Sequence, residues 1–187
     1  MTHPTSTRSV CVYCGSRPGA DPAYAQAATT LGTALAGESW RLVYGAGDVG
    51  LMGLVARAAQ EAGGETFGVI PTHLLDLEVG KRDLTRFIVT ENMHERKKVM
   101  FMNSDAVVVL PGGAGTLDEF FEILTWAQLG LHDKPIVLVN TGGFWDPLVA
   151  LVDHVIDQGF AAPSLKDFIT VADTPDAVMT TLRTRLA

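Results

Sequence analysis

The run Ala106-Val-Val-Val-Leu110 leads directly into Pro111-Gly-Gly-Ala-Gly-Thr-Leu-Asp-Glu119. The first segment is continuously apolar, as is typical of a parallel strand that is covered on both faces. Three glycines follow, and a helix is expected from Thr116 to about Leu129. Backbone amides at such a helix N-terminus, together with the helix dipole, favour an anion. A ligand-free glycine turn would not explain the helix directly behind it, so this stretch predicts a phosphate-binding loop.

The rest of the chain also alternates short β-branched segments with longer amphipathic segments. Strands are expected at 9–13, 41–44, 65–70, 86–89, 106–110, 135–139 and 168–171, with helices at 22–36, 51–62, 92–103, 116–129, 145–158 and 175–185. This alternation predicts an α/β fold, a doubly wound, Rossmann-like parallel sheet with helices on both faces. In such sheets ligands bind beyond the carboxyl ends of the strands, at a switch point. We expect a disordered leader at 1–8 and a single nucleotide-binding domain at 9–187.

Composition restricts the class of protein. The chain has 187 residues, is 47% hydrophobic and carries a formal net charge of −7. An acidic surface argues against a nucleic-acid partner, because phosphate backbones are bound by basic faces. No apolar run approaches the roughly 20 residues of a membrane span, and the first eight residues lack a signal-peptide core. With two cysteines, we expect a cytoplasmic protein without membrane association.

A second glycine cluster, Gly45-Ala-Gly-Asp-Val-Gly50, follows the strand expected at 41–44. It matches the GxGxxG pattern of dinucleotide-binding folds, which is a weak signal on its own. Those folds also place an acidic residue at the end of the next strand. Glu65 has the right spacing but falls at the start of its strand. We therefore interpret this loop as a second wall of a mononucleotide site.

Several charged residues could carry chemistry. Arg96 and Lys97 stand at the start of the helix that Asn92 and Glu95 are expected to cap. Arg96 opposes the dipole of that helix, which hints at a role beyond stability. Glu119 is expected in the first turn of its own helix, close to the phosphate loop, where its carboxylate either favours the helix dipole or contacts a ribose or a water. Asp118 is expected to be solvated.

The pair Cys11 and Cys14 invites a redox interpretation. Redox pairs of this spacing usually sit at helix N-termini, where the dipole lowers the thiol pKa. Here Cys11 falls within an expected strand and Cys14 at its end, so both are interpreted as structural. Two cysteines and scattered histidines give no metal-ligand spacing.

The chain resembles the LONELY GUY (LOG) family of cytokinin-nucleotide phosphoribohydrolases, whose members were long described as lysine decarboxylases. Pro111–Glu119 matches the PGGxGTxxE signature of that family. The resemblance extends over about residues 9–180. Further matching stretches are Val10-Cys-Val-Tyr-Cys-Gly-Ser16, residues 44–53, Met93-His-Glu-Arg-Lys97, Thr125-Trp-Ala-Gln-Leu-Gly130 and His132-Asp-Lys-Pro135.

This resemblance implies a hydrolase that cleaves the N-glycosidic bond of N6-substituted or plain adenosine 5′-monophosphate. The products would be the free base and ribose 5-phosphate. It also implies a homodimer with the site near its interface, and neither metal nor cofactor. By matching position, Arg96 and Glu119 correspond to the catalytic pair. The implied substrate contacts are Ser16, Gly45, Gly47, Glu78, Lys97, Gly112, Gly113, Gly115, Thr116 and Thr125.

Two positions depart from the family pattern. Ala46 stands where family members often have glycine, and its methyl group is expected to narrow the approach to the nucleotide. Ala114 replaces a tyrosine that is common in the signature. Both changes bear on the choice of N6 substituent rather than on the phosphate loop.

Two other classes of protein fit parts of the pattern. One is a non-catalytic carrier of a nucleotide or of molybdenum cofactor with the same fold, and the combination of Arg96 with Glu119 speaks against it. The other is a dinucleotide-dependent oxidoreductase, which the position of Glu65 disfavours. Lysine decarboxylase chemistry is not expected, because no lysine lies in a recognisable cofactor motif.

Overall fold

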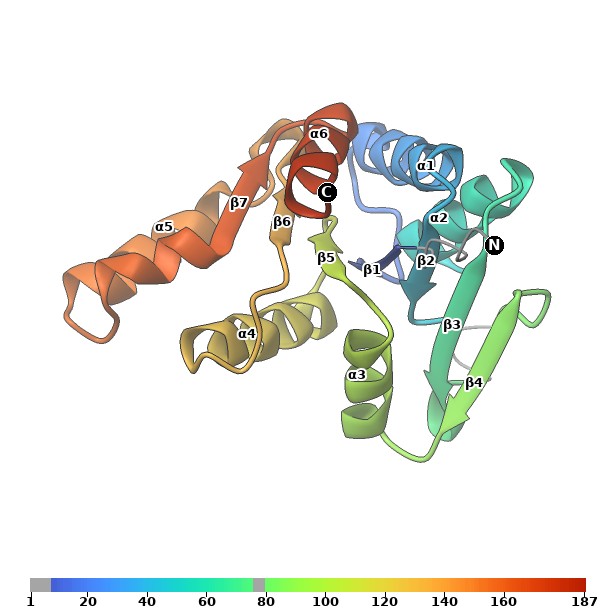
Figure 1. The fold of residues 1–187 in the computed structure, drawn as a ribbon, viewed down its shortest axis with the longest axis horizontal. Coiled ribbons are helices and arrows are strands. Elements are labelled where there is room, and N and C mark those ends of the chain that lie inside the picture. The colour runs from blue at the N-terminus through green and yellow to red at the C-terminus, as the bar shows by residue number, and fades with distance from the viewer. Residues whose placement is uncertain (1–7, 76–79) are drawn as a thin grey trace, which may run out of the picture.

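The computed structural model describes residues 8–75 and 80–187 (Figure 1). The leader expected at 1–8 lies outside the described residues except for Arg8, whose carbonyl accepts a hydrogen bond from the Arg41 amide at 2.8 Å. Among the described residues, no helix combines the length and the apolar character that crossing a bilayer requires.

The described strands form one seven-stranded sheet in which all neighbours are parallel. They are β1 (Ser9–Tyr13), β2 (Arg41–Tyr44), β3 (Thr66–Pro71), β4 (Arg86–Thr90), β5 (Ala106–Val109), β6 (Ile136–Val139) and β7 (Ile169–Ala172). Their order is β4-β3-β2-β1-β5-β6-β7. The chain thus builds outward from β1 to β4 and then returns to the other side of β1, which puts the switch point between β1 and β5.

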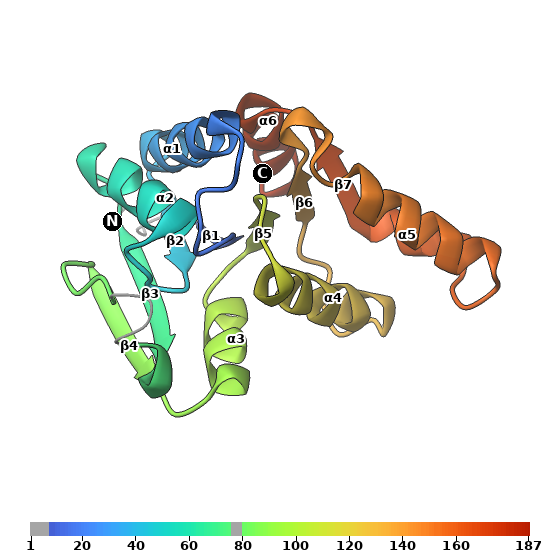
Figure 2. The same ribbon diagram turned by 180° about the vertical axis from the view of Figure 1, so that it is seen from behind.

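Helices cover both faces of the sheet (Figures 1 and 2). One face carries α1 (Pro22–Gly37), α2 (Gly50–Glu61) and α6 (Pro175–Arg185), and the other carries α3 (Met93–Met102), α4 (Ala114–Gln128) and α5 (Asp146–Asp157). Short 3-10 helices lie at η1 (Thr72–Leu74), η2 (Thr141–Gly143) and η3 (Pro163–Phe168). The predicted doubly wound α/β fold is confirmed.

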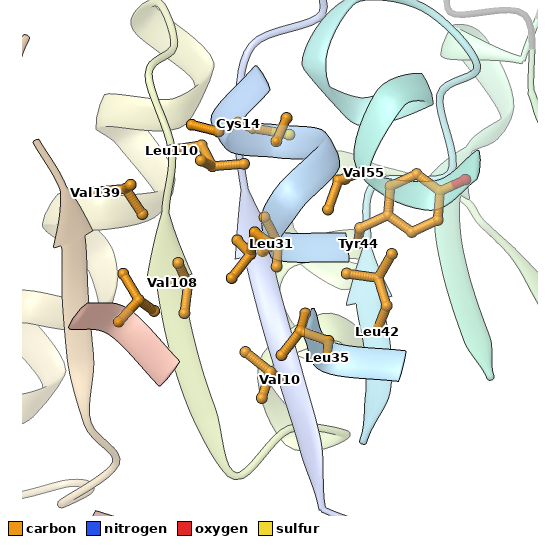
Figure 3. Close-up of a cluster of buried hydrophobic side chains, with 14 of the residues drawn as sticks. Val10, Cys14, Leu31, Leu35, Leu42, Tyr44, Val55, Val108, Leu110 and Val139 are labelled. Carbon is orange, nitrogen blue, oxygen red and sulfur yellow. The ribbon is translucent and has the colours of Figure 1, made fainter. Parts of the chain in front are cut away.

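Each face of the sheet has its own apolar core. In Figure 3, Val10 and Val108 from the strands meet Leu31 and Leu35 of α1 and Val55 of α2. All five side chains are fully buried. Burying one such side chain stabilises the fold by about 1.5–3 kcal/mol, so these contacts hold the helices at fixed positions on the sheet.

The loops that follow β1 and β5 are tied together at the switch point. The Leu110 amide donates to the Tyr13 carbonyl at 2.9 Å, and the Gly15 amide donates to the Pro111 carbonyl at 3.0 Å. A Cβ on Gly15 would lie only 3.3 Å from the Gly112 Cα. The sheet therefore delivers two glycine-containing loops to one place.

The helix ends show where local sequence signals succeeded and failed. The Asn92 side chain accepts from the Glu95 amide at 3.0 Å, which confirms the predicted start of α3. The helix expected at 22–36 extends through Gly37, and beyond its end Ser39 adopts the left-handed conformation, with φ 58°. The helix expected at 51–62 ends at Glu61, and beyond it Gly63 adopts the left-handed conformation, with φ 78°.

The start of α4 also differs from the prediction. The helix begins at Ala114 rather than Thr116, with Gly113 as an N-cap that offers no side chain. Glu119 therefore lies in the second turn and not in the first. The sequence contains no side-chain cap at this point, so the pattern gave no signal for the earlier start.

Candidate active site

A cavity of about 680 Å³ opens at the carboxyl ends of β1 and β5, at the switch point. Its walls include the loop after β1, the glycine loop after β5, and side chains from α2, α3 and α4. This volume lies within the range of small-molecule sites. The location is the one that the doubly wound topology favours for a ligand.

The glycine loop forms the wall next to α4. The first bond within this helix runs from the Leu117 amide to the Gly113 carbonyl at 3.0 Å, so the amides of Ala114, Gly115 and Thr116 precede it. All three residues line the cavity. An uncapped helix N-terminus that faces a cavity presents amide donors and the positive end of the dipole to an anion.

Gly112 allows this wall to be compact. A Cβ at Gly112 would collide with the hydroxyl and methyl groups of Thr116, which is itself buried. Gly113 and Gly115 have open space around the position of a Cβ. Only the first of these glycines is therefore required by close packing of the loop against its own helix.

Arg96 projects from α3 and is 4% exposed. Its Nη2 donates to the Gly45 carbonyl at 2.7 Å, and its Nε donates to the Val69 carbonyl at 3.1 Å. A Cβ on Gly45 would overlap the guanidinium, so glycine is needed at that position. The ends of β2 and β3 thus fix the orientation of a buried cation that lines the cavity.

Glu119 is 8% exposed and faces the same cavity from α4. The negative charge of Glu119 affects the ionisation of the buried Cys11 thiol on β1. Burial, and after it the charge of Glu119, raises the pKa of the Cys11 thiol well above its usual value. A buried thiol with a raised pKa is a poor nucleophile, which agrees with a structural role for Cys11. The site therefore brings together one buried guanidinium and one buried carboxylate.

The structure gathers most of the sequence-predicted site residues around this cavity. Arg96 lies on α3 and Glu119 on α4, and both line the cavity. The predicted substrate contacts that also line it are Ser16, Gly45, Gly112, Gly113, Gly115 and Thr116. These residues come from four segments that are far apart in the chain.

Three other predicted contacts lie elsewhere among the described residues. Lys97 is buried between α3 and α4, where its Nζ is 2.9 Å from Asp118 and 3.2 Å from Glu122. Asp118 is thus exposed but ion-paired, rather than simply solvated. Thr125 is exposed, and its hydroxyl donates to the Phe121 carbonyl at 2.7 Å. Gly47 pairs with Gly80 in an isolated bridge, and Glu78 lies outside the described residues.

The methyl group of Ala46 does not take the expected position. Ala46 is fully buried with φ 58°, and it packs against Gly68 of β3 rather than lining the cavity. The expectation that this methyl group narrows the approach to a nucleotide is therefore corrected. Ala114, by contrast, does line the cavity.

Sequence reasoning missed several lining residues. Tyr24 of α1 and Phe144, which follows η2, line one end of the cavity with their ring centroids 5.3 Å apart. Met93 and Met100 of α3 line another part. Arg17 could have been found, because it lies on the loop that follows the carboxyl end of β1. The aromatic and methionine residues have no local signal, since only tertiary packing brings them to the site.

The described residues contain no group of three or more His, Cys, Asp and Glu side chains arranged to hold a metal ion. The chemical groups that line the cavity are a fixed guanidinium, a carboxylate and an anion-binding loop. Such a set can hold a phosphate ester, stabilise a positive charge beside the carboxylate and stabilise a leaving anion beside the guanidinium.

Comparison with protein families gives a match over most of the chain. A family model described as "Possible lysine decarboxylase" matches residues 52–182. The chain is 44% identical over 168 residues to a probable cytokinin riboside 5′-monophosphate phosphoribohydrolase, LOGL2, of Oryza sativa subsp. japonica. The aligned region covers 90% of this chain and 69% of that protein. It is also 44% identical over 165 residues to cytokinin riboside 5′-monophosphate phosphoribohydrolase LOG5 of Arabidopsis thaliana, covering 88% and 72%.

Solved structures share the fold. The molybdenum cofactor binding protein of Rippkaea orientalis superposes with a TM-score of 0.76 at 23% identity, over 98% of this chain and 99% of that one. At this identity the likeness describes architecture alone.

Proposed function

Because the chain belongs to the LOG family, whose family model carries the lysine decarboxylase description, we propose that it is a cytokinin riboside 5′-monophosphate phosphoribohydrolase. The enzyme hydrolyses the bond between base and ribose of an N6-substituted adenosine 5′-monophosphate. The free base and ribose 5-phosphate are the products. The observation that carries this proposal is the meeting of Arg96, Glu119 and the glycine loop at one cavity.

The glycine loop is proposed to hold the 5′-phosphate. Amides of Ala114, Gly115 and Thr116 precede the first bond within α4 and line the cavity. A phosphate held there fixes the ribose relative to the side chains behind it. Such positioning lowers the barrier by removing freedom of motion before the chemical step.

Glu119 and Arg96 are proposed to act on the two sides of the breaking bond. As the bond between C1′ and the base nitrogen breaks, its electron pair leaves with the base and C1′ becomes positively charged. Glu119 stabilises that charge through the ribose hydroxyls or orients the attacking water. Water supplies the hydroxyl group on C1′ and the proton that the base takes up.

Arg96 suits the other side of the bond. A guanidinium stays protonated and donates in a fixed plane, so it can stabilise negative charge on the departing base. The carbonyls of Gly45 and Val69 already orient it. Little reorganisation would then be needed at the moment of reaction.

We also propose a homodimer that forms through the outer sides of α3 and α4. Large apolar side chains are exposed on these helices and on the segment after α4, namely Met102, Phe121, Leu129 and Leu131. Phe101 packs against Trp126 and His132, which brings the ends of the two helices together. Large exposed apolar side chains near the packed ends of two helices support an interaction site there. Cys11 and Cys14 form no disulfide, in keeping with the proposed cytoplasmic location.

Product analysis tests the proposed reaction. The purified protein is mixed with AMP, with N6-isopentenyl-AMP and with the two matching unphosphorylated ribosides, and the products are separated by chromatography. We expect free base and ribose 5-phosphate from the nucleotides but not from the ribosides. The ratio of rates for the two nucleotides then reports the contribution of the N6 substituent. Binding of AMP without release of base from any compound would contradict the enzyme and favour a carrier.

A further inference from the structure

Arg17 gives the cavity a charged residue that the proposed reaction has not used. It lies on the loop after β1 and lines the cavity. Among the described lining residues, the cationic side chains are those of Arg17 and Arg96, and the anionic one is that of Glu119. Arg96 is buried and donates hydrogen bonds to two backbone carbonyls, whereas Arg17 is exposed. None of the described hydrogen bonds or ion pairs involves the Arg17 guanidinium.

A phosphate monoester bound at the glycine loop needs positively charged groups beside it. Such an ester carries a charge of about −1.5 to −2 at pH 7, whereas a helix N-terminus offers the equivalent of only about half a positive charge. The chain as a whole has a net charge of −7, and Glu119 faces the cavity. Lys97 cannot easily help, because Asp118 and Glu122 already pair with it.

The backbone of Arg17 is held beside the glycine loop. The Gly15 amide donates to the Pro111 carbonyl, and the Gly15 carbonyl accepts from the Leu51 amide at 3.1 Å. Gly50 packs so closely against Ser16 and Arg17 that a Cβ there would overlap their backbone. The following residue, Pro18, restricts Arg17 to extended conformations. The backbone of Arg17 is therefore fixed beside the glycine loop, and Arg17 lines the same cavity as Ala114, Gly115 and Thr116.

We propose that Arg17 donates to the phosphate of the substrate and completes the anion site of the glycine loop. This inference rests on the proposed function, because it concerns the 5′-phosphate of the same substrate. Arginine suits the position, since its planar fork can give two parallel hydrogen bonds to one phosphate. Arg17 is thereby a specificity residue that favours 5′-monophosphates over unphosphorylated ribosides.

Ribose 5-phosphate is the probe of choice because it carries the phosphate but has no base to lose. Its dissociation constant is measured by titration calorimetry for the wild type, Arg17→Ala, Arg17→Lys and the control Arg185→Ala. Arg185 is exposed in the last turn of α6, so its removal changes the net charge equally. Because α6 runs back against the strands, its last turn lies away from the cavity.

We expect Arg17→Ala to weaken ribose 5-phosphate binding about tenfold, as for loss of a hydrogen bond to a charged group. Arg17→Lys should recover part of the loss, and Arg185→Ala should leave binding as in the wild type. The dependence of the dissociation constant on salt should become weaker only in Arg17→Ala. With nucleotide substrates, KM should rise more than kcat falls.

The two proposals can fail separately. If the wild type releases base from nucleotides but Arg17→Ala binds ribose 5-phosphate within twofold of the wild type, the role of Arg17 is refuted. The proposed hydrolase activity is then still supported. If the wild type releases no base yet binds ribose 5-phosphate in an Arg17-dependent manner, the enzyme is refuted and the anion site stands. Absence of binding by the wild type would overturn the role of Arg17 as well.

Discussion

Glu119 is a buried carboxylate whose nearest chemical alternative is an amide of almost the same shape. The change Glu119→Gln removes the negative charge while leaving the glycine loop in place. We expect kcat for N6-isopentenyl-AMP to fall at least about 100-fold, because a positioned carboxylate contributes roughly that much or more. AMP binding, measured by calorimetry, should persist because the loop amides are unchanged.

Glu122 provides a matched control for this change. It is one turn further along α4, but its carboxylate pairs with Lys97 and does not line the cavity. Glu122→Gln should therefore keep turnover close to that of the wild type. Equal losses in both variants would attribute the effect to α4 as a whole rather than to the Glu119 carboxylate, and wild-type turnover in Glu119→Gln would remove this residue from the mechanism.

Gly112 and Gly113 are adjacent residues with opposite steric surroundings. A Cβ at Gly112 would meet Thr116, whereas a Cβ at Gly113 would meet nothing within 4 Å. We expect Gly112→Ala to lower the free energy of unfolding by about 1–3 kcal/mol, the usual cost of overpacking. Gly113→Ala should lower it by less, at most about 1 kcal/mol, because alanine is a poorer N-cap than glycine but its Cβ would meet no neighbouring atom. Urea unfolding of both variants checks this difference. Equal stability of the two variants would show that Thr116 and the first turn of α4 move aside for the new Cβ at little cost.

At the scale of elements, α1 and α2 end in the same hydrogen-bonding motif with different residues. In α1 the Trp40 amide donates to the Leu35 carbonyl at 3.0 Å, and in α2 the Gly64 amide donates to the Ala59 carbonyl at 2.8 Å. The left-handed position between them is Ser39 in α1 and Gly63 in α2. Glycine adopts that conformation without the steric cost that a side chain imposes.

Exchanging the two residues gives a reciprocal test. Ser39 is exposed and a Cβ on Gly63 would face open space, so neither change alters packing. We expect Ser39→Gly to raise the free energy of unfolding by about 1 kcal/mol and Gly63→Ser to lower it by about the same amount. Thermal unfolding followed by circular dichroism measures both. Shifts of the same sign in both variants would contradict the strain at Ser39.

The elements also show how far the sequence alone could lead. The strands were predictable because each is a short apolar run bounded by Gly, Pro or polar residues, as in Ala106–Leu110 before Pro111. The start of α3 was predictable because Asn92 and Glu95 provide side-chain caps. The start of α4 was not, since Gly113 caps it without a side chain.

The residues of the candidate site also fall into those that the sequence could predict and those that it could not. Residues that follow a strand end, such as Ser16 and the glycine loop, were predictable from topology and motif. Tyr24 and Phe144 were not, because they meet at the cavity only after α1 and η2 pack together. Lys97 was predicted as a substrate contact from its place in a motif, and its side chain is ion-paired with Asp118 and Glu122 of α4 instead of lining the cavity. A substrate contact of Lys97 stays a prediction.

At the scale of the whole molecule, the exposed apolar residues fall into separate groups. Leu129 and Leu131 follow α4, close to Met102 at the end of α3 in the chain's fold. Phe160 is 86% exposed but follows α5, which lies apart from α3 in both views (Figures 1 and 2). A dimer through α3 and α4 would bury the first group and leave Phe160 in solvent.

Charge placed in each group tests this arrangement. In an interface, the carboxylate of Leu131→Glu would be buried without a partner, which costs several kcal/mol and far exceeds the loss of one apolar contact. We expect this variant to sediment as a monomer at micromolar concentration, where the wild type sediments as a dimer. Phe160→Glu introduces the same charge and should remain dimeric. A dimer that survives Leu131→Glu but dissociates in Phe160→Glu would place the interface at the end of α5 instead of at α3 and α4. A wild type that sediments as a monomer would contradict the proposed homodimer.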